Sequence, residues 1–341
     1  MLKYSIRTIE SILYVGVDKM KAAFNRYWPI YKNLEEETLQ LSKYIQFTDN
    51  QLGVYSTHIA DLLAICAMEI ESLSKELYWE NGGEKVYGKN GKERDLFFDV
   101  DCVEFLNGLW GICEKELLVS STKFYFEKPE NRKICPLHNA NKRGKTKWNK
   151  AYQAVKHDRK NSLNQGTIEN LISAMGALFI LNLYYMDDKI ELGTTHTPSK
   201  AFDSRMGSEI FSATYTDVTV AVQMDAGMTD NAIPEKLKAN LNSSIYIIKY
   251  TTSALTNIFN AFEKDSQQLA KDLLESESLI KYYEQHPEEI KNISEENVIT
   301  LVSRFLGSDY IRNNHSLGRF GQAFMEAKKE AILNKNQPIY G

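Results

Sequence analysis

Apolar residues recur at steps of three and four along much of the first 190 residues, and this spacing predicts amphipathic helices. The clearest stripe indicates a helix over residues 55–79, which should stop at Asn81-Gly82-Gly83. Three further stripes are marked by Val103, Leu106, Trp110, Cys113 and Leu117, by Trp148, Tyr152 and Val155, and by Ile168, Ile172, Met175, Phe179 and Met186. Another helix is expected over residues 34–44. Four such helices need a common core, so the pattern predicts an antiparallel helical bundle.

The pattern changes near residue 193, where we place a domain boundary. Beyond it, apolar and polar residues alternate in two stretches, which predicts strands over residues 211–215 and 218–224. The apolar run at residues 245–250 fits either a third strand or a buried helix.

From residue 253 onward the pattern is helical again, and the last helix is expected to run from about residue 317 to 334. The predicted fold class is mainly α: an N-terminal helix and a helical bundle in residues 1–192, then a smaller α+β domain of unknown role in residues 193–341.

The composition is that of a globular protein, with 43% hydrophobic and 25% charged residues. The longest apolar runs fall far short of the ~20 residues that a membrane span needs. The N-terminus shows no apolar signal core. We therefore expect a cytoplasmic protein without a membrane partner. The four cysteines show no Cys-x-x-Cys spacing, so no metal site is expected. The chain has neither a Gly-x-Gly-x-x-Gly nor a Walker sequence, and no cofactor is expected.

Charge is distributed very unevenly. Eleven of the 33 residues in 128–160 are Lys or Arg, against two acids, so this positive segment carries about +9. The whole chain is formally −4, which leaves about −13 for the other residues. A positive segment on an acidic protein points to a polyanion, most often a nucleic acid. The candidate nucleic-acid-binding residues are Arg132, Lys142, Arg143, Lys145, Lys147 and Lys150.

The segment ends in a short helical motif that holds the candidate catalytic residues His157, Lys156 and Arg159. A neutral histidine could take a proton from a ribose 2′-hydroxyl, and a neighbouring cation could stabilise the negative charge that follows. The same residues could instead bind an anion without catalysis, or offset the helix dipole as a C-terminal cap. Glu69, at the edge of the first helix's apolar stripe, is expected to form a structural ion pair with Arg159 or Lys156.

This helical motif resembles the Trp-x-x-Tyr-x-x-Val-Lys-His-x-Arg helix of uncharacterised bacterial proteins with HEPN-like helical domains. The matching residues are Trp148, Tyr152, Val155, Lys156, His157 and Arg159, preceded by Glu69-Ile70-Glu71 and Lys75. The resemblance covers about residues 50–190. It implies a dimeric four-helix bundle. Many such domains are metal-independent ribonucleases of toxin–antitoxin, abortive-infection and CRISPR systems, with an Arg-x4–6-His motif.

No arginine stands four to six residues before His157, and the spacing is met only by Arg132 with His138. The preferred hypothesis is a nucleic-acid-facing HEPN-like protein, with RNA cleavage in bacterial defence or a toxin–antitoxin response as its implied activity. The expected partners are RNA, a second copy of the chain, and an antitoxin or defence-system protein. The alternative is a non-catalytic helical interaction module that binds a protein partner or a small ligand.

Overall fold

The computed structural model describes residues 25–194, 201–287, 298–310, 312–316 and 318–340. Its α-helices are α2 (Tyr27–Leu41), α3 (Thr57–Glu80), α4 (Glu104–Trp110), α5 (Pro129–Arg132), α6 (Lys147–His157), α7 (Arg159–Ser162), α8 (Ile168–Met186), α9 (Glu235–Lys238), α10 (Thr252–Leu274), α11 (Glu277–Gln285), α13 (Val298–Phe305) and α14 (Arg319–Met325). Two π-helices are η2 (Phe98–Val103) and η8 (Arg312–Ser316).

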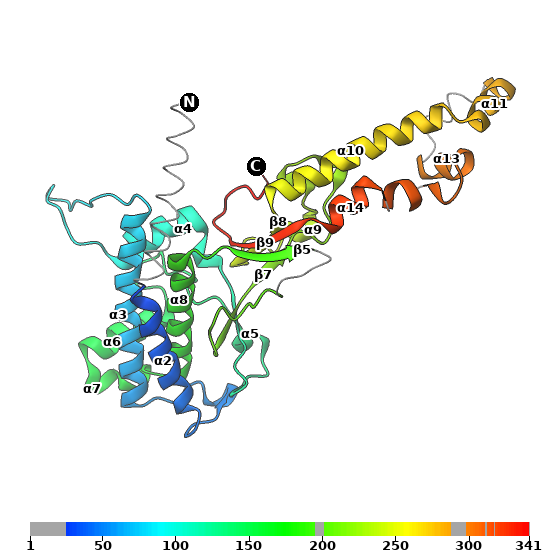
Figure 1. The fold of residues 1–341 in the computed structure, drawn as a ribbon. Helices are drawn as coiled ribbons and strands as arrows, with labels where there is room; N and C mark the ends of the chain where they lie inside the picture. The colour runs from blue at the N-terminus through cyan, green and yellow to red at the C-terminus, as the bar shows by residue number, and fades with distance from the viewer. Residues whose placement is uncertain (1–24, 195–200, 288–297, 311, 317, 341) are drawn as a thin grey trace.

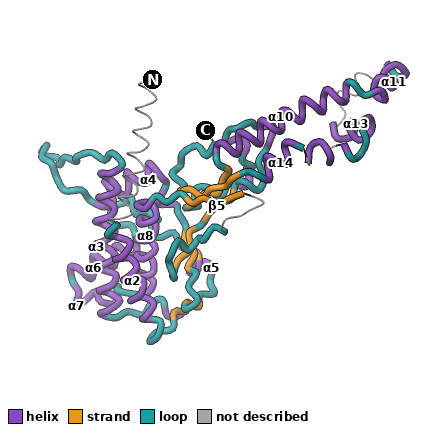
Figure 2. Tube along the Cα trace, viewed as in Figure 1, coloured by secondary structure: helices purple, strands orange, loops and turns teal. Residues whose placement is uncertain are grey.

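The strands are short: β1 (Phe47–Thr48), β2 (Leu117–Val119), β3 (Phe124–Tyr125), β4 (Lys133–Ile134), β5 (Ile190–Thr194), β6 (Phe211–Ala213), β7 (Tyr215–Asp217), β8 (Tyr246–Tyr250) and β9 (Lys328–Leu333). Figure 2 shows most of the strand structure near the middle of the molecule, with one group of helices on each side of it. The chain is therefore mainly α with an α+β component.

Helices α2, α3, α6 and α8 contact one another and form what we call the helical body (Figure 1). The predicted helices over residues 55–79, 148–155 and 168–186 are confirmed as α3, α6 and α8. The N-terminal helix, expected over residues 34–44, is α2, which begins and ends earlier, at Tyr27 and Leu41.

Local signals fix where the two longest helices of the body begin and end. The side chain of Ser56 accepts a hydrogen bond from the Ile59 amide at the start of α3, and Thr167 accepts one from Asn170 at the start of α8. Asp187 ends α8 in the left-handed region, at φ 51°.

Within the described part of the chain, α8 alone has the length and apolar character of a membrane span. Most of α8 is buried inside the molecule against the other helices of the body, as expected for a core helix. Its composition is therefore explained by packing.

The helix predicted through Val103 and Leu117 is wrong in its second half. Gly111 has φ 62° and ends α4 after Trp110, because a left-handed residue stops helical hydrogen bonding. Leu117 instead begins β2, which pairs antiparallel with β4 and β6. Cys113 lies in a short 3-10 turn and is buried, so its apolar character reflects the core and not a helix face.

The main sheet has the strand order β5-β9-β8-β7, in which β7 and β8 are parallel and the other pairs antiparallel. Residues 245–250 are thus a strand. The last predicted helix is wrong beyond α14, because residues 328–333 form β9 between β5 and β8. The strand over residues 218–224 is also wrong: the Asp217 carboxylate accepts hydrogen bonds from the amide and hydroxyl of Thr219, which turns the chain.

The predicted boundary at residue 193 falls inside β5. The hydrophobic core of the helical body also continues into the sheet through Tyr246, Ile248 and Leu333. The two predicted domains therefore share one core. Helix α10 leaves the sheet and projects outward with α11, α13 and α14 as an arm (Figure 1), which has its own small core of Leu279, Leu301 and Phe305.

Candidate nucleic-acid interface

The position of α6 in the helical body is set by its buried face. Trp148 is 1% exposed, and its indole Nε1 donates a 2.9 Å hydrogen bond to the carbonyl of Pro136. Tyr152 and Val155 are buried on the same face. The helix ends at Asp158, whose carboxylate caps α7 by accepting a hydrogen bond from the Asn161 amide. The residues opposite Trp148 therefore face solvent.

The three candidate catalytic residues lie at this exposed end of α6 but do not form one cluster. His157 and Lys156 are exposed, and the Lys156 ammonium lies 5.3 Å from the centroid of the Tyr152 ring. Arg159 is turned toward α3, where its guanidinium forms an ion pair with Asp61. The charge of Arg159 is thus already matched by a carboxylate.

The ion pair predicted for Glu69 is wrong. Arg159 takes Asp61 as its partner, and within the described residues Glu69 has no ion pair. Glu69 is half-buried on α3, and desolvation raises the pKa of its carboxyl. A helical wheel places Glu69 near the edge of burial, but it cannot reveal which neighbouring helix meets that edge.

Most cations of the positive segment are exposed and lack an acidic partner. Ion pairs join Lys133 to Glu116 on the loop before β2, Lys147 to Glu169 on α8, and Arg159 to Asp61. The other eight are exposed and have no carboxylate partner among the described residues: Lys128, Arg132, Lys142, Arg143, Lys145, Lys150, Lys156 and Lys160. Unlike the other predicted nucleic-acid-binding residues, Lys147 is therefore neutralised by an acid.

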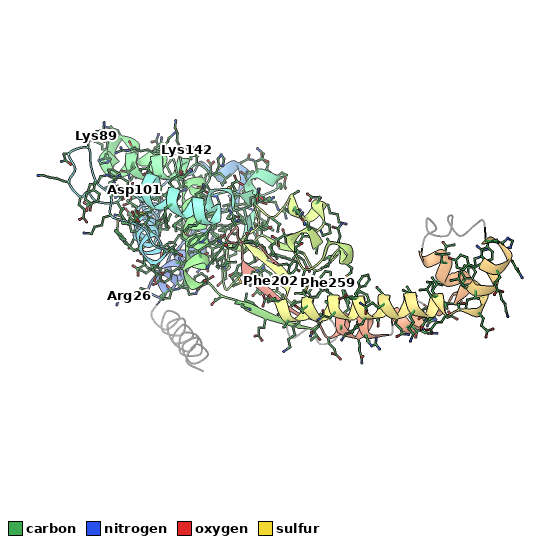
Figure 3. All side chains as sticks on the ribbon, turned by 90° about the horizontal axis from the view of Figure 1, so that it is seen from above. Arg26, Lys89, Asp101, Lys142, Phe202 and Phe259 are labelled. Carbon is green, nitrogen blue, oxygen red and sulfur yellow. The ribbon has the colours of Figure 1, made fainter. Side chains whose placement is uncertain are left out.

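The loop before α6 is held against the π-helix η2 and α4. The amide of Gly144 donates to the Asp99 carboxylate at 3.4 Å, and the Asn141 side chain donates to Glu104 at 2.6 Å. These contacts hold Asn141 and Gly144, the residues on either side of Lys142 and Arg143. In Figure 3, Lys142 and Asp101 both lie on the side of the molecule that holds the helical body, away from Phe259 on the arm.

Arg132 and His138, which have the Arg-x5-His spacing, lie on different elements. Arg132 ends α5, whereas His138 lies in a turn after Pro136 where its amide bonds to the Cys135 carbonyl. Both side chains are exposed, and no hydrogen bond between them exists.

A pocket of about 390 Å³ lies beside the loop and was not predicted from the sequence. Its wall and floor are formed by Lys75, Phe97, Asp99, Arg143, Asn149 and Gln153, and we call it the α3–α6 pocket. Phe97 is 41% exposed, and the guanidiniums of Arg94 and Arg143 lie 4.5 and 4.8 Å from its ring centroid. Phe97 and Arg143 lie far apart in the sequence, so their contact could not be predicted from the sequence alone.

No group of three or more His, Cys, Asp or Glu side chains in the described residues is arranged to hold a metal ion. Burial raises the pKa of all four cysteine thiols, which disfavours the thiolate that a metal would require.

No protein-family model, curated protein or solved structure matches this chain. The HEPN-like resemblance of residues 50–190 therefore stays a prediction.

Proposed function

We propose that this protein binds RNA through the positive segment. The observation that carries the proposal is the set of eight exposed cations without a carboxylate partner. A cation already paired with an acid gains little from a phosphate, whereas an unpaired one releases the counterions that surround the nucleic acid. The negative charge of the rest of the chain should orient the approaching strand toward this surface.

Binding is better supported than cleavage. A general base acting on RNA needs a neighbouring cation to stabilise the charge that develops at the phosphorus. Arg159 is committed to Asp61, which leaves Lys156 as the adjacent unpaired cation beside His157. Because one of the two candidate cations is already neutralised by Asp61, we infer an anion-binding role for the end of α6.

The proposal is tested by changing Lys142, Lys145 and Lys150 to serine. All three are exposed and unpaired, so folding should be unaffected while affinity for single-stranded RNA falls roughly 10- to 100-fold at low salt. The measurement is fluorescence anisotropy with labelled RNA and DNA. A matched control changes Lys43, Lys236 and Lys264, which are exposed, lie outside the positive segment and have no carboxylate partner among the described residues, so the net charge is altered equally. Equal loss in both variants would show that net charge matters and the surface does not.

Cleavage by His157 is tested separately with His157→Ala. Because the imidazole is exposed, we expect the free energy of unfolding of the variant to lie within about 1 kcal/mol of the wild-type value. RNA binding should change little. If the wild type cleaves RNA and the variant does so 10²- to 10⁴-fold more slowly, His157 is a general base and the binding-only proposal is wrong.

The finer features implied by the resemblance belong to the same proposal. We infer that the helical body is an antiparallel bundle of HEPN-like type, acting in the cytoplasm as a homodimer with an antitoxin or defence-system partner. A monomer in light scattering at tens of micromolar would remove the dimer. If no RNA binds at any salt concentration, the alternative of a non-catalytic protein-interaction module takes precedence.

A further inference from the structure

We propose that the α3–α6 pocket receives one amino-bearing nucleobase, which is guanine, adenine or cytosine, from the bound RNA strand. This inference rests on the proposed RNA binding and assigns a second role to residues beside the positive segment. The pocket has a volume of about 390 Å³, within the roughly 300–1,000 Å³ that is typical of small-molecule binding sites.

The floor of the pocket has unused hydrogen-bonding capacity. Asn149 on α6 is 5% exposed, and its side-chain Oδ1 has no hydrogen-bond partner. The Oδ1 atom is shielded from solvent, so a ligand N–H group would reach it once the side-chain amide turns toward the pocket, and the bond would remove the free-energy cost of the unsatisfied oxygen. Asp99, 8% exposed, adds a carboxylate to the same lining. The two Asp99 oxygens accept hydrogen bonds from the Val100 and Gly144 amides, and each keeps a second lone pair for a ligand. Acceptors on one lining fit the N–H groups of an amino-bearing base and fit uracil less well.

The mouth of the pocket supplies a surface for stacking. Arg94 is fixed by two hydrogen bonds to Asp101, at 2.6 and 2.9 Å, so it stays beside the Phe97 ring. Arg143 also lies over Phe97 but has no acidic partner among the described residues. Its guanidinium is therefore free to move and to stack on an entering base or bind its phosphate.

The pocket interior and its surroundings differ in charge, as the base and the phosphates of an RNA strand do. Its lining holds two cations, Lys75 and Arg143, and two acids, Glu71 and Asp99, so the interior has no net charge. The exposed Lys142 and Lys145 flank Gly144 of the lining and carry unbalanced positive charge. A neutral base inside and its phosphates along the adjacent lysines match this distribution. One wall of the pocket is formed by the π-helix η2, and π-helical turns are frequent at functional sites.

The test uses the full chain and single-stranded RNA that carries one 2-aminopurine. Phe97→Ala should lower RNA affinity roughly tenfold, because stacking on an aromatic ring is lost. The salt dependence should stay unchanged, since no phosphate contact is removed. Binding should alter 2-aminopurine fluorescence in the wild type and not in the variant. Tyr87→Ala is the matched control: it removes another exposed aromatic ring of the neighbouring loop, outside the pocket.

The experiment distinguishes an error in the pocket inference from an error in the proposed RNA binding. If wild type, Phe97→Ala and Tyr87→Ala bind RNA equally, the pocket inference is overturned while the proposed function stands. If the wild type binds no RNA, the protein is titrated with the four nucleoside monophosphates. Binding that is weakest for uridine monophosphate and is abolished by Phe97→Ala would identify a free nucleotide as the source of the base. Binding of none of them, or equal binding of uridine monophosphate, overturns the inference.

Discussion

Replacing Lys115 with methionine should raise the free energy of unfolding by about 2 kcal/mol at pH 7. Lys115 is fully buried between α4 and β2, and its ammonium donates one hydrogen bond, to the Asn242 carbonyl at 3.0 Å. Desolvation lowers the pKa of this amine from 10.5 to about 8. A shift of that size corresponds to roughly 3 kcal/mol against folding, from which we subtract ~1 kcal/mol for the lost hydrogen bond.

The stabilisation should depend on pH in a defined direction. Below about pH 8 both the folded and the unfolded chain carry the charged amine, so the folded state bears the full cost. Between about pH 8 and 10.5 the folded state loses the proton first, so wild-type stability rises. The advantage of Lys115→Met should therefore shrink by about 2 kcal/mol between pH 7 and 9.5. Denaturant unfolding at pH 7 and at pH 9.5 measures this advantage, with the exposed Lys123→Met as control. A stability advantage that does not change with pH would contradict desolvation of the amine as its cause.

Trp148→Ala should destabilise the protein by about 3–5 kcal/mol, because it leaves a large cavity in the core and an unpaired carbonyl at Pro136. The indole packs near Phe98, with ring centroids 6.1 Å apart, and joins α6 to the wall of the α3–α6 pocket. The matched control is Trp79→Ala, since Trp79 is 49% exposed and should cost under about 1 kcal/mol. Equal costs in urea denaturation would contradict the assignment of the buried face of α6.

Helices with a long apolar stripe and a clear start and stop signal could be predicted from the sequence. For α3 and α8, periodicity, a Ser or Thr cap and a left-handed or Gly-rich stop all agree with the packing. The exposure of His157 could be predicted in the same way, because a helix that buries Trp148 places His157 nearly opposite it.

Elements that depend on distant partners could not be predicted in this way. The helical pattern of residues 328–333 gives way to β9 because two strands, β5 and β8, offer it hydrogen bonds on both sides. Asp61 and not Glu69 meets Arg159, since the crossing of α3 and α7 is set by the whole core. The α3–α6 pocket likewise needs residues from α3, η2 and α6 that lie far apart in the sequence.

In the proposed complex, unpaired cations of the positive segment contact RNA phosphates. The most direct test of these contacts is the wild-type affinity for single-stranded RNA measured from 50 to 200 mM salt. Each phosphate contacted should contribute a log–log slope of about −0.7, so four or more contacts predict a slope of about −3 or steeper. The account predicts that steep fall, reduced by about 2 when Lys142, Lys145 and Lys150 are changed to serine. A flat dependence, or no binding at 50 mM salt, would contradict it.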